Sequence, residues 1–107
     1  MNTQDQARAR ESTIEAVKVY LEQAFPQTIV ETRHDRDRLG TIFYVNARNG
    51  SPLHRVTLTP QLLDDTHDPS QLIAQLQRWG LITKMTNAGT SFVRVSERGI
   101  YSITESI

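Results

Sequence analysis

The chain has 107 residues, with 12 basic and 12 acidic side chains, 37% hydrophobic residues and no cysteine. This length fits a single domain, and the absence of cysteine excludes a disulfide framework, a zinc–cysteine site and a thiol nucleophile. The net charge of zero argues against a protein that binds nucleic acid through an overall basic surface, and no apolar run approaches the roughly 20 residues of a membrane span.

The N-terminal segment is polar and carries both charge signs, unlike a signal peptide. We therefore expect a cytoplasmic protein with a flexible tail over residues 1–11 and one domain over residues 12–107. A helix is predicted over residues 13–25, because Ser12 and Glu15 have capping-box spacing and apolar residues then recur at helical intervals. Pro26 ends this helix, since proline disfavours helical geometry in the residue before it.

Three strands are predicted next, over residues 28–33, 41–48 and 51–59, which are rich in β-branched and aromatic residues. A charged loop, expected to be solvated, separates the first two strands from His34 to Gly40. Asn49-Gly50 predicts a two-residue hairpin turn between the second and third strands. Such a turn sets residue 48 opposite 51 and residue 43 opposite 56.

This register divides the predicted hairpin into two faces. The face expected to join the core carries Phe43, Val45, Ala47, His54, Val56 and Leu58. The opposite face mixes apolar, aromatic and polar side chains, namely Ile42, Tyr44, Asn46, Leu53, Arg55 and Thr57. A half-apolar second face of this kind indicates contact with a partner or with another part of the chain.

The C-terminal half begins with Thr59-Pro60, an N-cap and first-turn proline that predict a short helical turn through Leu63. Asp68-Pro69 repeats this signal for a helix over residues 69–79, which Gly80 ends. Two strands are expected over residues 81–86 and 91–96, and a last short strand over 100–104. The resulting fold class is α+β, with two helices packed on a mainly antiparallel sheet of about five strands, in the order α-β-β-β-α-β-β.

The predicted core combines the apolar stripes of the two helices with the inward residues of the strands. Its members are Ile14, Val17, Leu21, Phe25, Phe43, Val45, Val56, Leu58, Leu72, Ile73, Leu76, Leu81, Ile82, Phe92 and either Val93 or Val95.

Few residues suggest catalysis or metal binding. His54 falls on the apolar face of the hairpin, where an imidazole is more often a packed side chain than a catalytic base. Asp64, Asp65, His67 and Asp68 form a cluster, but its spacing matches no metal-binding loop and Asp68 is explained as an N-cap. The five glycines are scattered, so no phosphate-binding loop is present. We expect no enzyme, no catalytic residue, no cofactor and no bound metal.

The function favoured by the sequence is a small non-enzymatic module that binds a protein partner or a second copy of itself. The expected contact surface is Ile42, Tyr44, Leu53 and Arg55, because Tyr44 and Arg55 are cross-strand neighbours and both residue types are frequent in interfaces. A regulatory domain that binds a small molecule is a weaker alternative, with no specific residues to support it.

The other alternative is nucleic-acid binding. From Pro69 to Ser96 there is no acidic residue, while Arg78, Lys84 and Arg94 are present. The run from Leu72 through Trp79-Gly80-Leu81-Ile82 to Ser96-Glu97-Arg98-Gly99 resembles the end of a winged-helix DNA-binding domain. This resemblance implies a recognition helix that ends near Arg78 and a wing that carries Lys84 and Arg94 near phosphates. The three strands before the helix depart from that family, in which the corresponding region is helical.

Overall fold

The computed structural model describes residues 3–35, 40–66 and 68–103 and has an α+β fold. A five-stranded sheet with the order β1-β2-β3-β4-β5 forms its centre. The elements in chain order are α1 (Thr3–Ala24), β1 (Thr28–Asp35), β2 (Gly40–Ala47), β3 (Pro52–Leu58), α2 (Pro60–Asp65), α3 (Pro69–Arg78), α4 (Leu81–Ala88), β4 (Phe92–Ser96) and β5 (Gly99–Ile103). The predicted fold class is confirmed.

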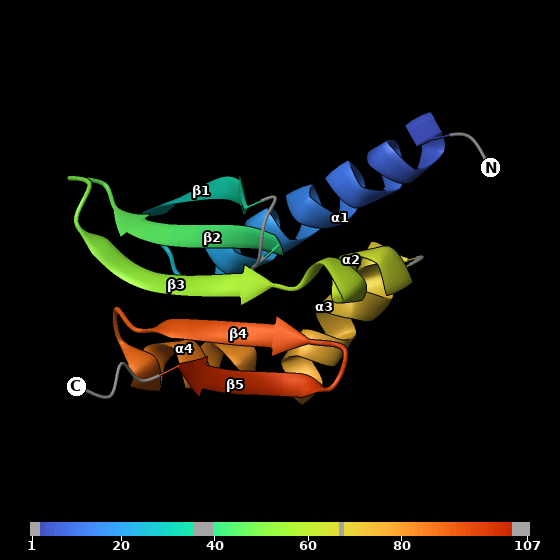
Figure 1. Cartoon of the computed structure of the whole chain (residues 1–107). Helices are drawn as coiled ribbons and strands as arrows, with labels where there is room; N and C mark the ends of the chain where they lie inside the picture. The colour runs from blue at the N-terminus through green and yellow to red at the C-terminus, as the bar shows by residue number, and fades with distance from the viewer. Residues whose placement is uncertain (1–2, 36–39, 67, 104–107) are drawn as a thin grey trace.

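The sheet is mixed, with one parallel pair among antiparallel ones. β1, β2 and β3 pair antiparallel in succession, and β4 pairs antiparallel with β5. β3 and β4 run parallel, and the chain passes through α2, α3 and α4 between them, as a parallel connection requires. In Figure 1, α1 lies behind β1 and β2 and α4 lies behind β4, so no described helix covers the face turned to the viewer.

The β2–β3 turn differs in detail from the prediction. Gly50 N–H donates to Ala47 O and Ala47 N–H donates to Ser51 O, both at 2.8 Å, and Gly50 has a φ of 92°. This is a three-residue loop closed by a bulged glycine, so the predicted pairing of 48 with 51 is wrong. A second irregularity makes Leu53 an extra residue in β3, and it restores the predicted pairing of Phe43 with Val56.

Helix α1 is longer than predicted. It begins at Thr3 and ends at Ala24, so most of the segment expected to be a tail is helical and Ser12 lies inside the helix, not at a cap. The added turns contain glutamine, alanine, arginine and glutamate, which favour helix although they form no apolar stripe.

The region after Gly80 is the main correction to the predicted secondary structure. Residues 81–86 are not a strand, because Leu81–Ala88 forms helix α4. Gly80 adopts a left-handed conformation and donates its N–H to Gln77 O at 3.1 Å, which ends α3 before α4 begins. Leu81 and Met85, one helical turn apart, are both fully buried, so packing on the sheet outweighs the strand propensity of the β-branched residues here.

The side-chain caps at the starts of α2 and α3 are as predicted. Thr59 Oγ1 accepts from Leu62 N–H at 3.3 Å at the start of α2. Asp68 Oδ1 accepts from Ser70 N–H at 2.9 Å at the start of α3. Pro60 and Pro69 follow the two caps at the first helical position, where no N–H is needed.

The core lies between the sheet and the helices. The predicted members that are buried are Ile14, Val17, Leu21, Phe43, Val45, Val56, Leu58, Leu72, Leu76, Leu81, Val93 and Val95, and Phe25, Ile73 and Ile82 pack against them half-buried. Core residues that the sequence pattern missed are Val30, Leu62, Leu63 and Met85. Phe92 is not in this core, because it neighbours Val93 in β4 and therefore points to the opposite face.

Candidate binding surface

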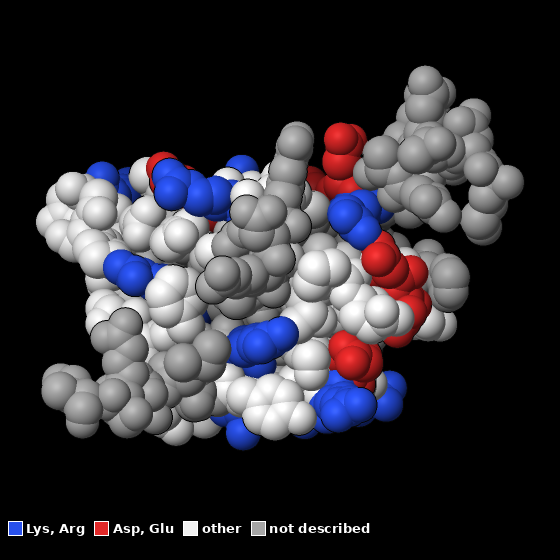
Figure 2. Space-filling view, in the orientation of Figure 1, with Lys and Arg blue, Asp and Glu red and all other residues white. Residues whose placement is uncertain are grey.

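The sheet face that no described helix covers carries side chains from all five strands. Because residues opposite each other in neighbouring strands share a face, the strand registers define its members. This helix-free face comprises Ile29, Glu31, Arg33, Ile42, Tyr44, Asn46, Arg55, Thr57, Phe92, Arg94 and Tyr101. Figure 2 views the molecule from this side.

A row of four side chains crosses the middle of the helix-free face. Glu31 is opposite Tyr44, Tyr44 is opposite Arg55, and Arg55 is opposite Phe92. The Arg55 guanidinium carbon lies 5.9 Å from the centroid of the Tyr44 ring and 5.2 Å from that of the Phe92 ring. Both distances allow cation–π attraction, so the two rings hold the half-buried arginine in position.

The burial of Arg55 leaves one polar atom unpaired. Its Nε is buried and has no hydrogen-bond partner. A buried donor without a partner destabilises a fold, by about 1–3 kcal/mol for a typical group. Stability alone therefore does not explain an arginine at position 55, whereas a binding role at the surface of the sheet would explain it.

A second row crosses the face from Arg33 through Ile42, Thr57 and Arg94 to Tyr101. The side chains at its centre are buried, since Ile42 is 7% and Thr57 2% exposed, whereas Tyr101 at its end is 52% exposed. Ile42 was expected to contact a partner, but it has little surface to offer. Leu53, another expected contact, is exposed in the β3 bulge, and Ile29 on β1 is 48% exposed.

The charges on the helix-free face differ from the neutral balance of the whole chain. Arg33, Arg55 and Arg94 lie on it with Glu31, and the strand register also places Asp35, the last residue of β1, on this side. In Figure 2 most acidic atoms gather at the right of the view, at the end of the sheet where Figure 1 shows α2.

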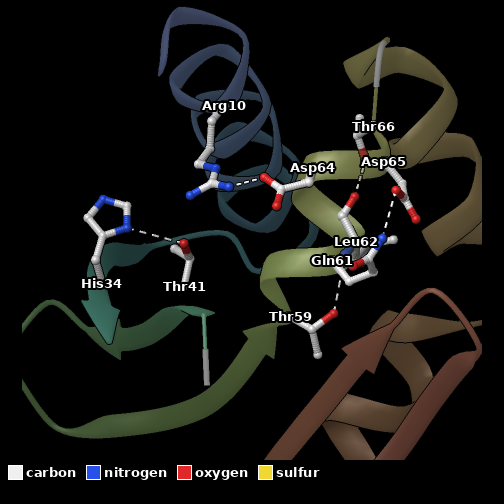
Figure 3. A network of polar contacts seen from close by, with 9 residues as sticks. All are labelled: Arg10, His34, Thr41, Thr59, Gln61, Leu62, Asp64, Asp65 and Thr66. Carbon is white, nitrogen blue, oxygen red and sulfur yellow. Dashed lines mark hydrogen bonds and ion pairs between the residues drawn. The ribbon is translucent and has the colours of Figure 1, made fainter. Parts of the chain in front are cut away.

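The acidic cluster near α2 is occupied by structural contacts (Figure 3). Asp64 forms an ion pair with Arg10 of α1, and Asp65 Oδ1 accepts from Gln61 Nε2 at 3.0 Å. Asp68 caps α3, and His67 lies outside the described residues. Within the described part of the chain, no three metal-ligating side chains come together.

The three cations expected to bind nucleic acid do not form one surface. Arg78 is in the last turn of α3, and Lys84 is on α4, which packs behind the sheet. Arg94 is on β4 and faces the opposite side. The wing implied by the winged-helix resemblance is not formed, because residues 81–86 are helical. Arg94 instead lies beside the aromatic side chains of the helix-free face.

Two other features lie on the helical side of the sheet. His54 packs its ring on Phe25 with centroids 4.6 Å apart, and its Nδ1 is 3.1 Å from Gly89 O, a contact that serves packing. A groove of about 580 Å³ runs between α1 and α3 past Val19, Tyr20 and Ile73. Burial raises the pKa of the Tyr20 hydroxyl above its usual value, because the phenolate loses hydration there.

Sequence reasoning placed Tyr44 and Arg55 opposite each other but did not place Phe92 and Tyr101 on the same face. Tyr44 and Arg55 face each other across a local hairpin, and the predicted register paired them although it assumed a different turn. Phe92 meets Arg55 only through the parallel pairing of β3 with β4, which no local pattern indicates. The alternation of Phe92 and Arg94 with the buried Val93 and Val95 is the signal that could have placed both on the outer face.

No known protein family matches the sequence, and neither a characterised protein nor a solved structure is similar enough to support a comparison. Among the described residues, no helix has the length and apolar character needed to cross a membrane. The functional conclusion therefore depends on the geometry alone.

Proposed function

We propose that this protein is a non-enzymatic protein-binding module and that a partner binds its helix-free face. The observation that supports the proposal is the row formed by Tyr44, Arg55 and Phe92, an arginine held between two aromatic rings on a sheet face that no described helix covers. Ile29 and Tyr101 add exposed apolar surface on either side of this row.

The chemistry of the row suits a protein interface. Tyrosine and arginine are enriched among the residues that dominate binding energies, and aromatic residues provide large contact areas with few rotatable bonds. An arginine already held by two rings loses little side-chain freedom when a partner binds, so the cost of ordering it on association is small. The expected partner offers an apolar patch with carboxylate or carbonyl oxygens opposite the arginines.

Single-stranded nucleic acid is the second candidate ligand, and one specific observation favours it. The aromatic side chains of the helix-free face lie among Arg33, Arg55 and Arg94, and bases stack on aromatic rings while arginines neutralise phosphates. The two candidates differ in their response to salt, because release of counterions makes nucleic-acid binding fall steeply as salt rises.

The test compares surface variants that keep the core intact. The tagged protein and the double variant Ile29→Ala/Tyr101→Ala are used to capture proteins from cells, with Val19→Ala/Lys84→Ala on the helical side as the matched control. Both pairs change exposed side chains only, so circular dichroism and melting temperature should stay unchanged. The affinity for the purified partner is then measured for both pairs and for Arg55→Ala.

We expect the helix-free-face variants to weaken binding about tenfold or more, and the control to bind as the wild type does. A partner that binds all variants equally would contradict the proposal. Fluorescence anisotropy with a labelled single-stranded oligonucleotide, at about 50 and 200 mM salt, tests the second candidate. Salt-sensitive binding that Arg55→Ala and Arg94→Ala abolish would replace the protein partner by nucleic acid.

A further inference from the structure

Strand β1 is an exposed edge of the sheet. It spans Thr28–Asp35 and, among the described strands, pairs with β2 alone (Figure 1). Four consecutive residues, Glu31 to His34, are exposed on it, so both faces of this part of the strand are open. A long edge with unpaired backbone groups is a template for pairing with another strand.

The hydrogen bonds of the hairpin indicate which backbone groups of β1 are unpaired. Ala47 donates its N–H to Ser51 and so faces β3. Backbone groups alternate in direction along a strand, so Asn46 and Tyr44 face β1. Their partners in β1, Ile29 and Glu31, therefore face β2, together with Arg33. The residues between them, Val30, Thr32 and His34, direct their N–H and C=O groups outward from the sheet.

We propose that two copies of this chain pair through β1, antiparallel about a two-fold axis at Thr32, so that their sheets become continuous. In this register Thr32 meets Thr32 of the second copy, and Val30 meets His34. These outward-facing residues would exchange backbone hydrogen bonds, as an antiparallel ladder requires. The interface is isologous, with the same residues contributed by each copy.

The charges of β1 favour this register over its neighbours. Centring the pairing on Thr32 places Glu31 opposite Arg33 of the second copy, and Arg33 opposite Glu31, in two equivalent pairs. Centring it on Glu31 or on Arg33 would instead set like charges opposite each other, which is destabilising in a sheet. Glu31 and Arg33 are both exposed and both on the helix-free face, so they can meet without rearrangement of the core.

Charge reversal gives the sharpest test. Sedimentation velocity over a range of concentrations measures the dimer dissociation constant of the full chain. We expect Glu31→Arg and Arg33→Glu each to raise this constant about tenfold or more, because each replaces two attractive pairs by two repulsive ones. The double variant Glu31→Arg/Arg33→Glu restores opposite charges and should return it to within about threefold of the wild type. Arg48→Glu, an exposed change in the β2–β3 turn with the same net charge as Arg33→Glu, should have no effect.

Two substitutions at Thr32 test the backbone pairing independently of charge. Thr32→Pro removes an outward-facing N–H and should give a folded monomer, since edge strands tolerate proline on their free side. Thr32→Cys should form a disulfide dimer under mild oxidation, because the two Cα atoms would lie about 5.5 Å apart. Thr90→Cys, also exposed, is the control and should not form one.

Recovery of dimerisation in the double reversal, together with disulfide formation at position 32 only, would support the proposal. A wild type that stays monomeric at about 1 mM, or a double reversal that stays as weak as the single ones, would overturn it. The proposal does not depend on the protein partner proposed above, because the β1 backbone with Glu31 and Arg33 forms the contact, and not the row of Tyr44, Arg55 and Phe92.

Discussion

Gly40 is the position where the structure predicts the largest effect of a single added carbon atom. It opens β2 with a φ of +88°, in the left-handed region that side chains rarely adopt. A Cβ at this position would overlap the carbonyl oxygen of Leu58 and would lie 2.9 Å from Cδ of Pro60. Gly40→Ala therefore strains the backbone and also forces apart β2 and the end of β3.

The two effects can be estimated separately. A non-glycine residue in the left-handed region costs about 1–2 kcal/mol. Added atoms in a packed site typically cost a further 1–3 kcal/mol or so, which gives a loss of about 2–5 kcal/mol in the free energy of unfolding. Gly50 provides the matched control, because its φ is +92° and a Cβ there would meet no atom within 4 Å. Gly50→Ala should lose only the backbone component, about 1–2 kcal/mol.

Urea denaturation followed by circular dichroism measures both losses. With an m-value of about 2 kcal/mol per molar urea, Gly40→Ala should lower the midpoint by roughly 1–2.5 M, and Gly50→Ala by less than about 1 M. The smaller backbone entropy of unfolded alanine applies to both variants and cancels in their difference. Equal losses for the two variants would refute the close approach of Gly40 to Leu58.

Other predictions concern packing, capping and ionisation. Leu76→Ala should lower the free energy of unfolding by about 2–5 kcal/mol in urea titrations, because Leu76 is fully buried, whereas the exposed Val19→Ala should change it by less than about 0.5 kcal/mol. Asp68→Ala should cost about 1 kcal/mol by removal of the α3 cap, and an unchanged midpoint would contradict that role. Because the pKa of Tyr20 is raised in the folded state, this tyrosine ionises first in the unfolded state. The contribution of Tyr20 to stability is therefore complete below about pH 10 and is lost at higher pH. Melting temperatures of Tyr20→Phe should therefore fall less than those of the wild type above pH 10.

Local signals in the sequence predicted the elements whose causes are local. Thr59 and Asp68 form the caps that their side chains favour, and each is followed by a proline suited to the first helical turn. The pairing of Phe43 with Val56 was also predicted correctly, although the two-residue turn from which it was predicted is not the turn that forms. A wider loop and the extra residue at Leu53 displace the strands in opposite directions, and the two displacements cancel.

Non-local packing explains what the sequence did not predict. Residues 81–86 contain Ile82, Thr83 and Thr86, whose branched side chains favour a strand when each residue is judged by itself. Their helical conformation depends on Leu81 and Met85 reaching a sheet surface that β3 and β4 form together. The parallel pairing of these strands also brings Phe92 to Arg55, so one long-range contact determines both α4 and the second ring of the candidate site.

The neutral composition of the chain conceals a separation of charge in the fold. Asp64, Asp65 and Asp68 are engaged in an ion pair, a side-chain hydrogen bond and a helix cap at one end of the molecule. Arg55 and Arg94 form no ion pair with another described residue, and they lie on the sheet, where the alternation of side chains directs them away from the helices. A net charge of zero therefore says little about the surface that a ligand would meet.

Pairing of two β1 edges would join two such faces side by side in one sheet. A partner with two binding segments could then contact both copies, and its apparent affinity would exceed its affinity for either face alone.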